Sequence, residues 1–346
     1  TVRVKADGYV EYQAVAALTD RTRDISLGDT HQASAGAVLL PALTRRDPVV
    51  EPLHVDGLRF TYPNGDPFVW VGWTAFATLK QWLDGGEAIA GPFVSQIRRL
   101  CDSVGMPWEP VLRIFRFAAP PNLFAVDPRQ YPDYLDQVVT CVRWLKSQSC
   151  RVLLTAGDAQ IVMPNQADQQ RHLNQVCEAL KAEPNVFIET CNQPYKNGID
   201  VGKIIPPPGL LRASGDSSDE TRHRTVLDFV TYTEGSRAGV PADYLPKWVS
   251  DEDAAVYQGW SGVPRVTVPW VNAEMMGFAE SEVPGRRSAD QRKSFMLAVK
   301  DAAFFHSASF HSDCGLASTP FLPIQKACAE AFVRGVMAGA TDPANL

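Results

Sequence analysis

The chain between residues 151 and 194 reads RVLLT (151–155), then a stretch of helical periodicity (166–182), then VFIETCNQP (186–194). In the middle stretch, apolar residues recur at three- and four-residue spacing, which predicts an amphipathic helix. The two flanking runs are short and carry few charges, as strands covered on both faces do. The stretch therefore predicts a strand, a helix and a second, parallel strand.

The same alternation extends through most of the chain. We expect strands at residues 69–72, 111–117, 151–155, 186–191, 210–213, 227–232, 265–271 and 308–311, and helices at 92–104, 131–147, 166–182, 289–305 and 322–337. Eight such units predict an α/β fold, a (β/α)8 TIM barrel. An open doubly wound sheet is the rival, but the segment after the first strand, GWTAF (72–76), is too bulky to cradle a phosphate.

Residues 1–55 differ from the rest, and we interpret them as a short N-terminal β extension ahead of a catalytic barrel at 56–346. The extension begins with a predicted hairpin around Asp7-Gly8. A second hairpin, residues 58–70 with its turn at 63–66, has the turn residues that such a structure needs. We expect it to close the N-terminal mouth of the barrel.

Composition excludes several classes of protein. The chain has 346 residues, a net charge of -6, 45% hydrophobic and 21% charged residues, which is typical of a soluble, mildly acidic globular protein. Nucleic-acid binding would need a clustered basic surface, and a membrane span would need about 18 consecutive apolar residues, so we expect neither partner. We expect a monomer that is secreted, its signal already removed, or else a protein not exported by that route.

Cysteine and histidine spacing gives no sign of a metal site. The seven cysteines include no CxxC pair and fall mostly in apolar stretches, so buried thiols are favoured over one or two disulfides. The six histidines are scattered without a recognisable ligand pattern. We therefore predict no metal and no cofactor.

The polar residues at the predicted strand ends are the candidates for chemistry, because a barrel carries its active site on that face. They are Trp73, Arg116, Asp158, Asn192, Gln193, Tyr232, Asn272, Glu274, His311 and Asp313.

Two of these strand ends resemble the retaining glycoside hydrolases built on (β/α)8 barrels, a clan that includes many cellulases, mannanases and other endo-glycosidases. FIETCNQP (187–194) resembles the clan's strand-four motif, which has glutamate where this chain has Gln193. PWVNAE (269–274) resembles its strand-seven motif. The resemblance implies that Glu274 is the nucleophile, that position 193 is the acid/base site, and that Arg116 and Tyr232 hold Glu274 ionised.

Retaining hydrolysis has its own physical requirements. One carboxyl group must protonate the leaving oxygen while another attacks the anomeric carbon, and the two must lie roughly 5–5.5 Å apart. Asn192 would donate to the sugar 2-hydroxyl, a contact that strengthens in the transition state. Trp73 and Trp270 are either sugar-stacking platforms or core residues. Asp158 is a candidate substrate contact, and His311 is either a substrate contact or a hydrogen-bonded loop residue.

Gln193 breaks this scheme, because an amide has no proton to give near neutral pH. The residue is a deliberate change from glutamate, or a natural one with Asp158 or Glu234 supplying the proton, or the mark of a sugar binder without catalysis. Glu189 does not replace it, because it would lie about 13 Å deeper along the same strand. We expect Glu189 to be a paired polar residue within or below the barrel.

The function that we predict is a retaining endo-glycoside hydrolase acting on a β-linked polysaccharide or oligosaccharide. The alternative is a carbohydrate-binding barrel without activity, in a viral or cell-surface assembly. An aldolase or isomerase is disfavoured, because no lysine ends a predicted strand and no glycine loop for phosphate follows strands seven and eight. The sugar, the linkage and the choice between internal and terminal cleavage are left open.

Overall fold

The computed structural model describes residues 2–6, 9–14, 50–194, 197, 199–215, 227–233, 268–274 and 291–341, a few of them by backbone alone. The chain divides into two compact units, residues 1–46 and 47–346. In the first unit, β1 (Val2–Ala6) and β2 (Tyr9–Ala14) pair antiparallel, as the predicted N-terminal hairpin requires. The second unit contains the predicted barrel.

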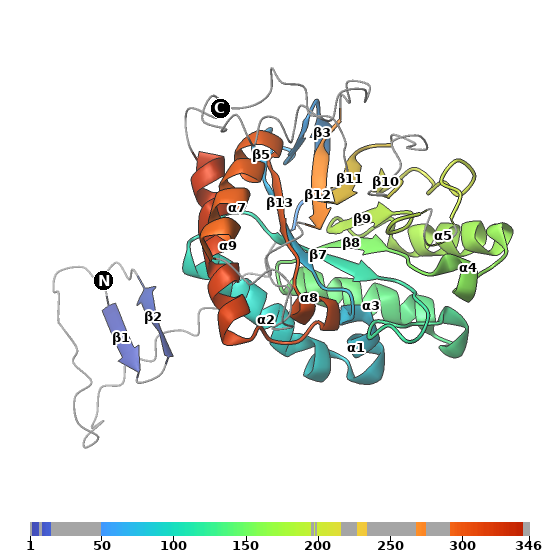
Figure 1. Ribbon diagram of the computed structural model, residues 1–346, viewed down its shortest axis with the longest axis horizontal. Coiled ribbons are helices and arrows are strands. Elements are labelled where there is room, and N and C mark those ends of the chain that lie inside the picture. The colour runs from blue at the N-terminus through green and yellow to red at the C-terminus, as the bar shows by residue number, and fades with distance from the viewer. Residues whose placement is uncertain are drawn as a thin grey trace. The chain divides into compact units, whose positions relative to one another are not determined.

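Six parallel strands form the main sheet of the second unit, in the order β10-β9-β8-β7-β6-β13 (Figure 1). They are β6 (Trp70–Thr74), β7 (Pro110–Phe115), β8 (Arg151–Thr155), β9 (Val186–Glu189), β10 (Leu211–Ala213) and β13 (Ser307–Phe310). β13 is the last of these strands in the chain and pairs with β6, the first in the chain, so the sheet curls back on itself.

Two further strands complete the barrel. β11 (Val230–Thr233) and β12 (Trp270–Glu274) pair in parallel. The backbone N–H groups of Asp228 and Phe229 donate to the carbonyl of Arg212 in β10, at 3.0 and 3.2 Å, and β12 lies beside β13 (Figure 1). The strands therefore follow one another around a (β/α)8 barrel, as the sequence predicts.

The helices lie outside the strands. They are α1 (Thr78–Gly85), α2 (Glu87–Ser103), α3 (Tyr134–Ser147), α4 (Ala159–Val162), α5 (Gln166–Leu180), α7 (Gln291–Phe305), α8 (Asp313–Ala317) and α9 (Pro323–Thr341), with a 3-10 turn, η1, at Pro128–Gln130. Each predicted helix is present. α2 begins at Glu87, which places Pro92 in its second turn rather than at its start.

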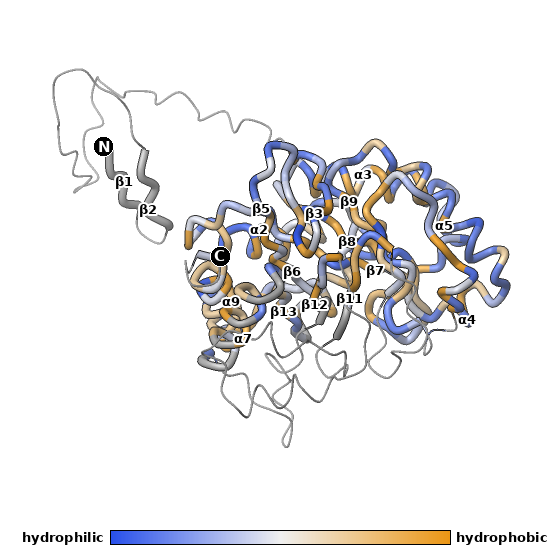
Figure 2. The backbone as a smooth tube through the Cα atoms, turned by 90° about the horizontal axis from the view of Figure 1, so that it is seen from above, coloured by the Kyte–Doolittle hydropathy of each residue, from blue (hydrophilic) through white to orange (hydrophobic). Residues whose placement is uncertain are grey.

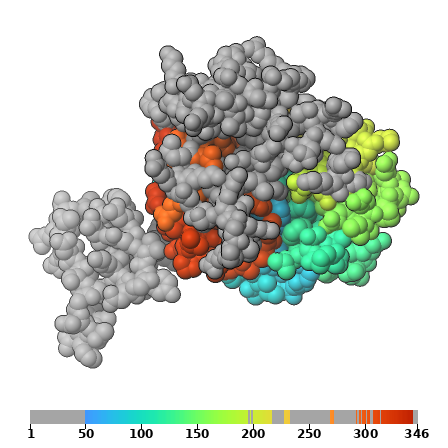
Figure 3. Space-filling model, in the orientation of Figure 1, coloured from blue at the N-terminus to red at the C-terminus, as the bar shows by residue number. Residues whose placement is uncertain are grey.

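Strand alternation divides the core into two layers. Val111, Leu153 and Phe187 point into the barrel, whereas Leu112 and Leu154 point outward to the helices. In Figure 2 the tube is hydrophobic along the strands and hydrophilic along much of α5 at the periphery. Residues of α1 to α5 form one continuous surface in Figure 3, coloured from cyan to green. Among the described residues, no helix is long and apolar enough to cross a membrane.

The N-terminal mouth of the barrel is closed by a three-stranded antiparallel sheet, β3 (His54–Asp56), β4 (Arg59–Thr61) and β5 (Pro67–Phe68). From β4, Phe60 packs on Trp70, Phe187 and Phe229, with ring centroids 5.6, 5.8 and 5.5 Å away. We call these four residues the aromatic floor. The predicted role of the hairpin at residues 58–70 is thereby confirmed.

Candidate active site

A buried ion pair between Arg113 and Glu189 lies inside the barrel, next to the aromatic floor along β9. Arg113 on β7 donates from Nε and Nη2 to Oε2 of Glu189 on β9, at 2.9 and 2.7 Å. Oε1 of the same carboxylate accepts from the hydroxyl of Thr231 on β11, at 2.6 Å. Arg113 is 2% exposed and Glu189 0%. Both carboxylate oxygens thus have partners, and Glu189 is the paired residue within the barrel that the sequence predicts.

The same arginine reaches the end of β9. Nη2 of Arg113 donates to Oδ1 of Asn192 at 3.0 Å. A guanidinium can only donate, so the Asn192 amide must present its oxygen to Arg113. The amide nitrogen then points away from the guanidinium, and it donates no hydrogen bond to another residue that the structure describes. The donation from Asn192 to a sugar hydroxyl stays a prediction.

Gln193 follows at the barrel mouth and is half-buried, with φ +43° in the left-handed region. Residues other than glycine hold this conformation at a cost of about 1–3 kcal/mol, and they cluster at functional sites. Its carbonyl accepts from the backbone N–H and the side-chain amide of Asn197, at 3.1 and 3.2 Å. Asn197 therefore stabilises the turn that presents position 193.

Asp158 belongs to a network that joins three loops. Its Oδ2 accepts from the N–H of Ala119 at 3.1 Å and from the side chain of Asn122 at 2.7 Å, both in the loop after β7. Its own N–H donates to Oδ1 of Asn197 at 2.7 Å. These hydrogen bonds hold Asp158 in the loop network, and its roles as a substrate contact or as a proton donor stay predictions. Glu234, the other candidate acid, lies outside the described residues.

His311 lies at the opposite side of the same edge, after β13. Its Nδ1 is 2.8 Å from the hydroxyl of Thr74 at the end of β6, and its ring lies 6.3 Å from that of Phe76. The ring is half-buried. Thr74 and His311 thus stand together at the mouth, where a substrate contact was predicted for His311.

The remaining predicted residues come from β11 and β12, whose last residues, 232–233 and 272–274, the structure describes by backbone alone. Tyr232 pairs with Asn272, and Thr233 pairs with Glu274 across a bulge in the register. The side chains of Tyr232, Asn272 and Glu274 lie outside the described residues. Two strands, β10 and β11, separate β9 from β12, so position 274 ends a strand across the mouth from position 193.

Arg116 is not at the mouth. It is 1% exposed, and its guanidinium donates to the carbonyls of Glu189 and Thr190, at 3.1 and 2.8 Å. Burial lowers the pKa of this guanidinium. The arginine that lies inside the barrel and reaches Asn192 is Arg113. The expected strand 111–117 ends at Phe115, and residues 113 and 116 lie on opposite faces, so the longer strand pointed to the wrong arginine.

Neither tryptophan forms a sugar platform at the mouth. Trp73 is 1% exposed and packs outside the barrel on Phe310 and Phe332, with centroids 5.5 and 5.3 Å away. Trp270 begins β12, and at about 3.3 Å per residue it lies about 13 Å below position 274. Val271 faces the aromatic floor, so Trp270 faces outward. For both residues the structure corrects the expectation of a sugar-stacking role.

All seven cysteines are buried, as thiols in the apolar core. Burial raises the pKa of Cys101, Cys141, Cys177 and Cys191 above the ordinary range. Of the two explanations for the cysteines, packing is therefore correct. Among the described residues, no group of three histidine, cysteine or acidic side chains has the arrangement of a metal site.

No protein-family model and no curated protein matches the chain. Several solved structures are similar to the chain in fold. A family 5 glycoside hydrolase from Bacteroides vulgatus has a TM-score of 0.53 at 15% identity, over 75% of this chain and 63% of that one. A structure described as a glycoside hydrolase has a TM-score of 0.52 at 14% identity, over 75% and 65%. This chain spans slightly less than two thirds of each of those proteins.

A third structure covers both chains more evenly. The β-glucanase SdGluc5_26A from Saccharophagus degradans, in complex with cellotetraose, has a TM-score of 0.51 at 14% identity, over 82% of this chain and 92% of that one. At such identities the likeness is one of fold. The barrel described here is thus similar to those of family 5 glycoside hydrolases.

Proposed function

We propose that the chain is a retaining endo-glycoside hydrolase for a β-linked polysaccharide or oligosaccharide, with Glu274 as nucleophile and position 193 as the acid/base site. The observation that carries the proposal is the group Arg113–Glu189–Asn192, which holds the Asn192 amide next to position 193 with its oxygen toward Arg113. The family resemblance and the fold of the solved relatives support the same reaction class.

The chemistry proceeds in two steps. Glu274 attacks the anomeric carbon as the bond to the leaving oxygen breaks, and that oxygen must receive a proton. A water molecule then cleaves the glycosyl ester and gives up a proton to the acid/base residue. Gln193 can perform neither transfer. In this chain the first step therefore needs a leaving group that departs without a proton, and the second step is slow.

An activated aryl glycoside supplies such a leaving group. With 2,4-dinitrophenyl β-cellobioside as the probe, we expect a stoichiometric burst of dinitrophenolate and an intact mass increased by one cellobiosyl group. The matched control is Glu274→Gln, which should show neither. An unchanged mass for this probe and for its mannobiosyl counterpart would contradict the nucleophile assignment.

A second function, a carbohydrate-binding barrel without catalysis, is favoured by Gln193 itself. Such a protein would bind the same sugars through Asn192 and the mouth loops. It would form no covalent adduct, so the mass measurement distinguishes the two proposals.

A further inference from the structure

Gln193 puts an uncharged side chain at the proposed acid/base position, and the surrounding turn holds it there. The residue is half-buried at the mouth, with φ +43°. The side-chain amide of Asn197 donates to the backbone carbonyls of both Asn192 and Gln193. The turn is thus fixed by hydrogen bonds to its own backbone, and the side chain at its apex is an amide that neither gives nor takes a proton.

Two carboxylates described near this position are already engaged in hydrogen bonds. Glu189 is 0% exposed, and its two oxygens accept from Arg113 and Thr231, at 2.7 and 2.6 Å. Oδ2 of Asp158 accepts from the side chain of Asn122 at 2.7 Å, within the loop network. A general base has to lie within about 2.6–3.2 Å of the water that it activates. Both carboxylates instead hold the framework around the mouth together.

A nucleophile that already carries a negative charge needs no base. An anion such as azide attacks the anomeric carbon of the glycosyl ester with its lone pair, and the bond from that carbon to Glu274 breaks, its electrons returning to the carboxylate. One anion enters and one carboxylate is released, so no proton moves. Water must lose a proton in the same step, and the Gln193 amide cannot accept it.

The charge at position 193 decides how easily an anion approaches. A carboxylate there would repel an anion across the short gap to the nucleophile, roughly 5–5.5 Å in retaining enzymes. The Gln193 amide carries no charge and has two N–H donors. The Asn192 amide beside it is also neutral, and its oxygen accepts from Arg113 at 3.0 Å. These two residues therefore bring no negative charge to the mouth.

We propose that the chain transfers glycosyl groups from β-glycosides with acidic leaving groups to small anionic acceptors of the azide and carboxylate class. The transfer rests on the proposed function, because it needs the glycosyl ester on Glu274. It adds a class of acceptor that a carboxylate at position 193 would repel. The product keeps the β configuration, because the anomeric carbon undergoes two displacements.

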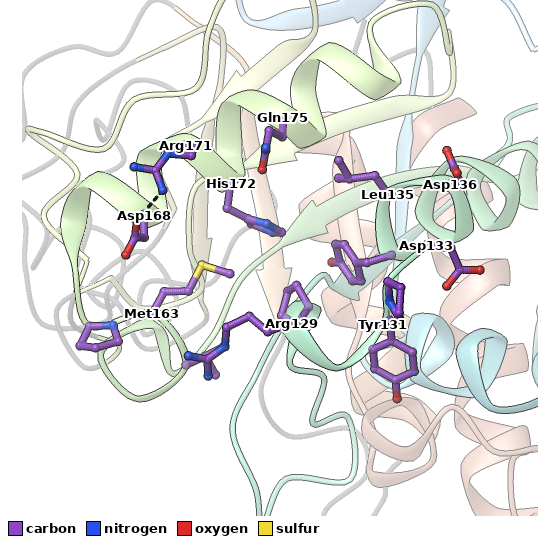
Figure 4. A pocket seen from close by; sticks show the side chains of 15 residues that line it. Arg129, Tyr131, Asp133, Leu135, Asp136, Met163, Asp168, Arg171, His172 and Gln175 are labelled. Atoms are coloured by element: carbon purple, nitrogen blue, oxygen red, sulfur yellow. Dashed lines mark hydrogen bonds and ion pairs between the residues drawn. The ribbon is translucent and has the colours of Figure 1, made fainter.

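A second place where an anion could bind lies outside the barrel, in a pocket of about 710 Å³ between α3 and the segment α4–α5 (Figure 4). The pocket lies beside His172 and contains Arg129 and Arg171. Arg129 pairs with Asp127, and Arg171 pairs with Asp168, each at 2.7 Å. Both arginines thus have a counter-charge, and Arg171→Gln serves as a control variant away from the mouth.

The test follows the turnover of 2,4-dinitrophenyl β-cellobioside in increasing sodium azide, with sodium chloride keeping the ionic strength constant. We expect azide to raise the steady-state release of dinitrophenolate about 10²-fold, the low end of what positioned proton transfer contributes. Cellobiosyl β-azide should accumulate, identified by NMR and mass. Sodium formate should accelerate the release in the same way.

Three variants show where the anion acts. Glu274→Gln should give no azide product. Gln193→Glu should release mainly cellobiose, because its carboxylate activates water and repels azide. Arg171→Gln should leave the azide effect as it is in the parent chain.

The two proposals fail separately. If neither a burst nor a covalent adduct forms, the nucleophile assignment fails, and the transfer fails with it. If the adduct forms but azide neither raises its turnover nor yields the β-azide, the transfer alone is overturned. An equal yield of azide product from Gln193→Glu, an α-azide, or an azide effect that Arg171→Gln abolishes would also overturn it.

Discussion

The two ends of strand β9 differ in chemistry although they lie only two residues apart. Phe187 and Glu189 both point into the barrel. Phe187 joins the aromatic floor, whereas Glu189 holds Arg113 and, through it, Asn192. The inward residues thus change from packing to hydrogen bonding within one strand. This difference separates residues that stabilise the barrel from residues that position its mouth.

The largest effect is expected from the polar end. Glu189→Gln removes the carboxylate that pairs with the buried guanidinium of Arg113, so the free energy of unfolding should fall by about 3–5 kcal/mol. Urea denaturation measures it. The control is the double variant Glu189→Leu with Arg113→Met, which removes both charges and should cost much less. Equal losses of unfolding free energy in the single and double variants would show that neutralising one partner of the ion pair costs no more than removing both charges.

The next effect concerns binding rather than stability. Asn192→Ala removes the oriented amide, and the affinity for a tetrasaccharide bound at the mouth should fall by about 1.5–3 kcal/mol. Calorimetric titration measures the affinity, and urea denaturation should show a near-normal fold. Asn122→Ala, in the neighbouring loop network, is the matched amide control. An affinity that Asn192→Ala leaves unchanged would show that Asn192 does not bind the sugar at the mouth.

A smaller effect is expected from the floor. Phe187→Leu keeps an apolar side chain, so it should cost about 1–1.5 kcal/mol of unfolding free energy. Sugar binding by the folded protein should stay unchanged, because the aromatic floor lies at the closed end. A loss of binding as large as that of Asn192→Ala would erase the distinction between the two ends.

The smallest effect is a dependence on pH outside the barrel. Burial lowers the pKa of His172 to about 3, against about 6.5 in an unfolded chain. Between these values the unfolded state binds a proton that the folded state does not, so stability is lost as pH falls below about 6.5. Urea midpoints at about pH 7 and about pH 6 should therefore differ less in His172→Phe than in the parent chain.

The exposed His54 supplies the control for this measurement, since His54→Phe should leave the difference between the two midpoints as it is in the parent chain. A difference of the same size in His172→Phe would show that His172 is not held neutral by burial.

Sequence periodicity predicted the strands and helices because each apolar run had to be covered on both faces. Periodicity was less informative about the face of the sheet to which a side chain near a strand end points. Taking β7 as ending at residue 117 rather than Phe115 pointed to Arg116, whereas a lone arginine among apolar residues in VLRIF (111–115) was the signal for Arg113. Trp73 was misplaced for a similar reason, since an aromatic residue near a strand end suits either face.

The left-handed turn at Gln193 and the pocket beside His172 had no local signal. Both depend on contacts between distant segments, such as Asn197 with Gln193 and Tyr134 with His172. Such contacts form only when the loops after β7, β8 and β9 come together in three dimensions.

The most direct test of the proposed function is the rate of polysaccharide hydrolysis by Gln193→Glu, with reducing ends measured on β-glucan and β-mannan. Positioned proton transfer contributes roughly 10²–10⁴-fold, so the variant should exceed the parent chain by that factor, and adding Glu274→Gln should abolish the gain. A Gln193→Glu variant that binds these polysaccharides but cleaves them no faster than the parent would contradict the assignment of position 193.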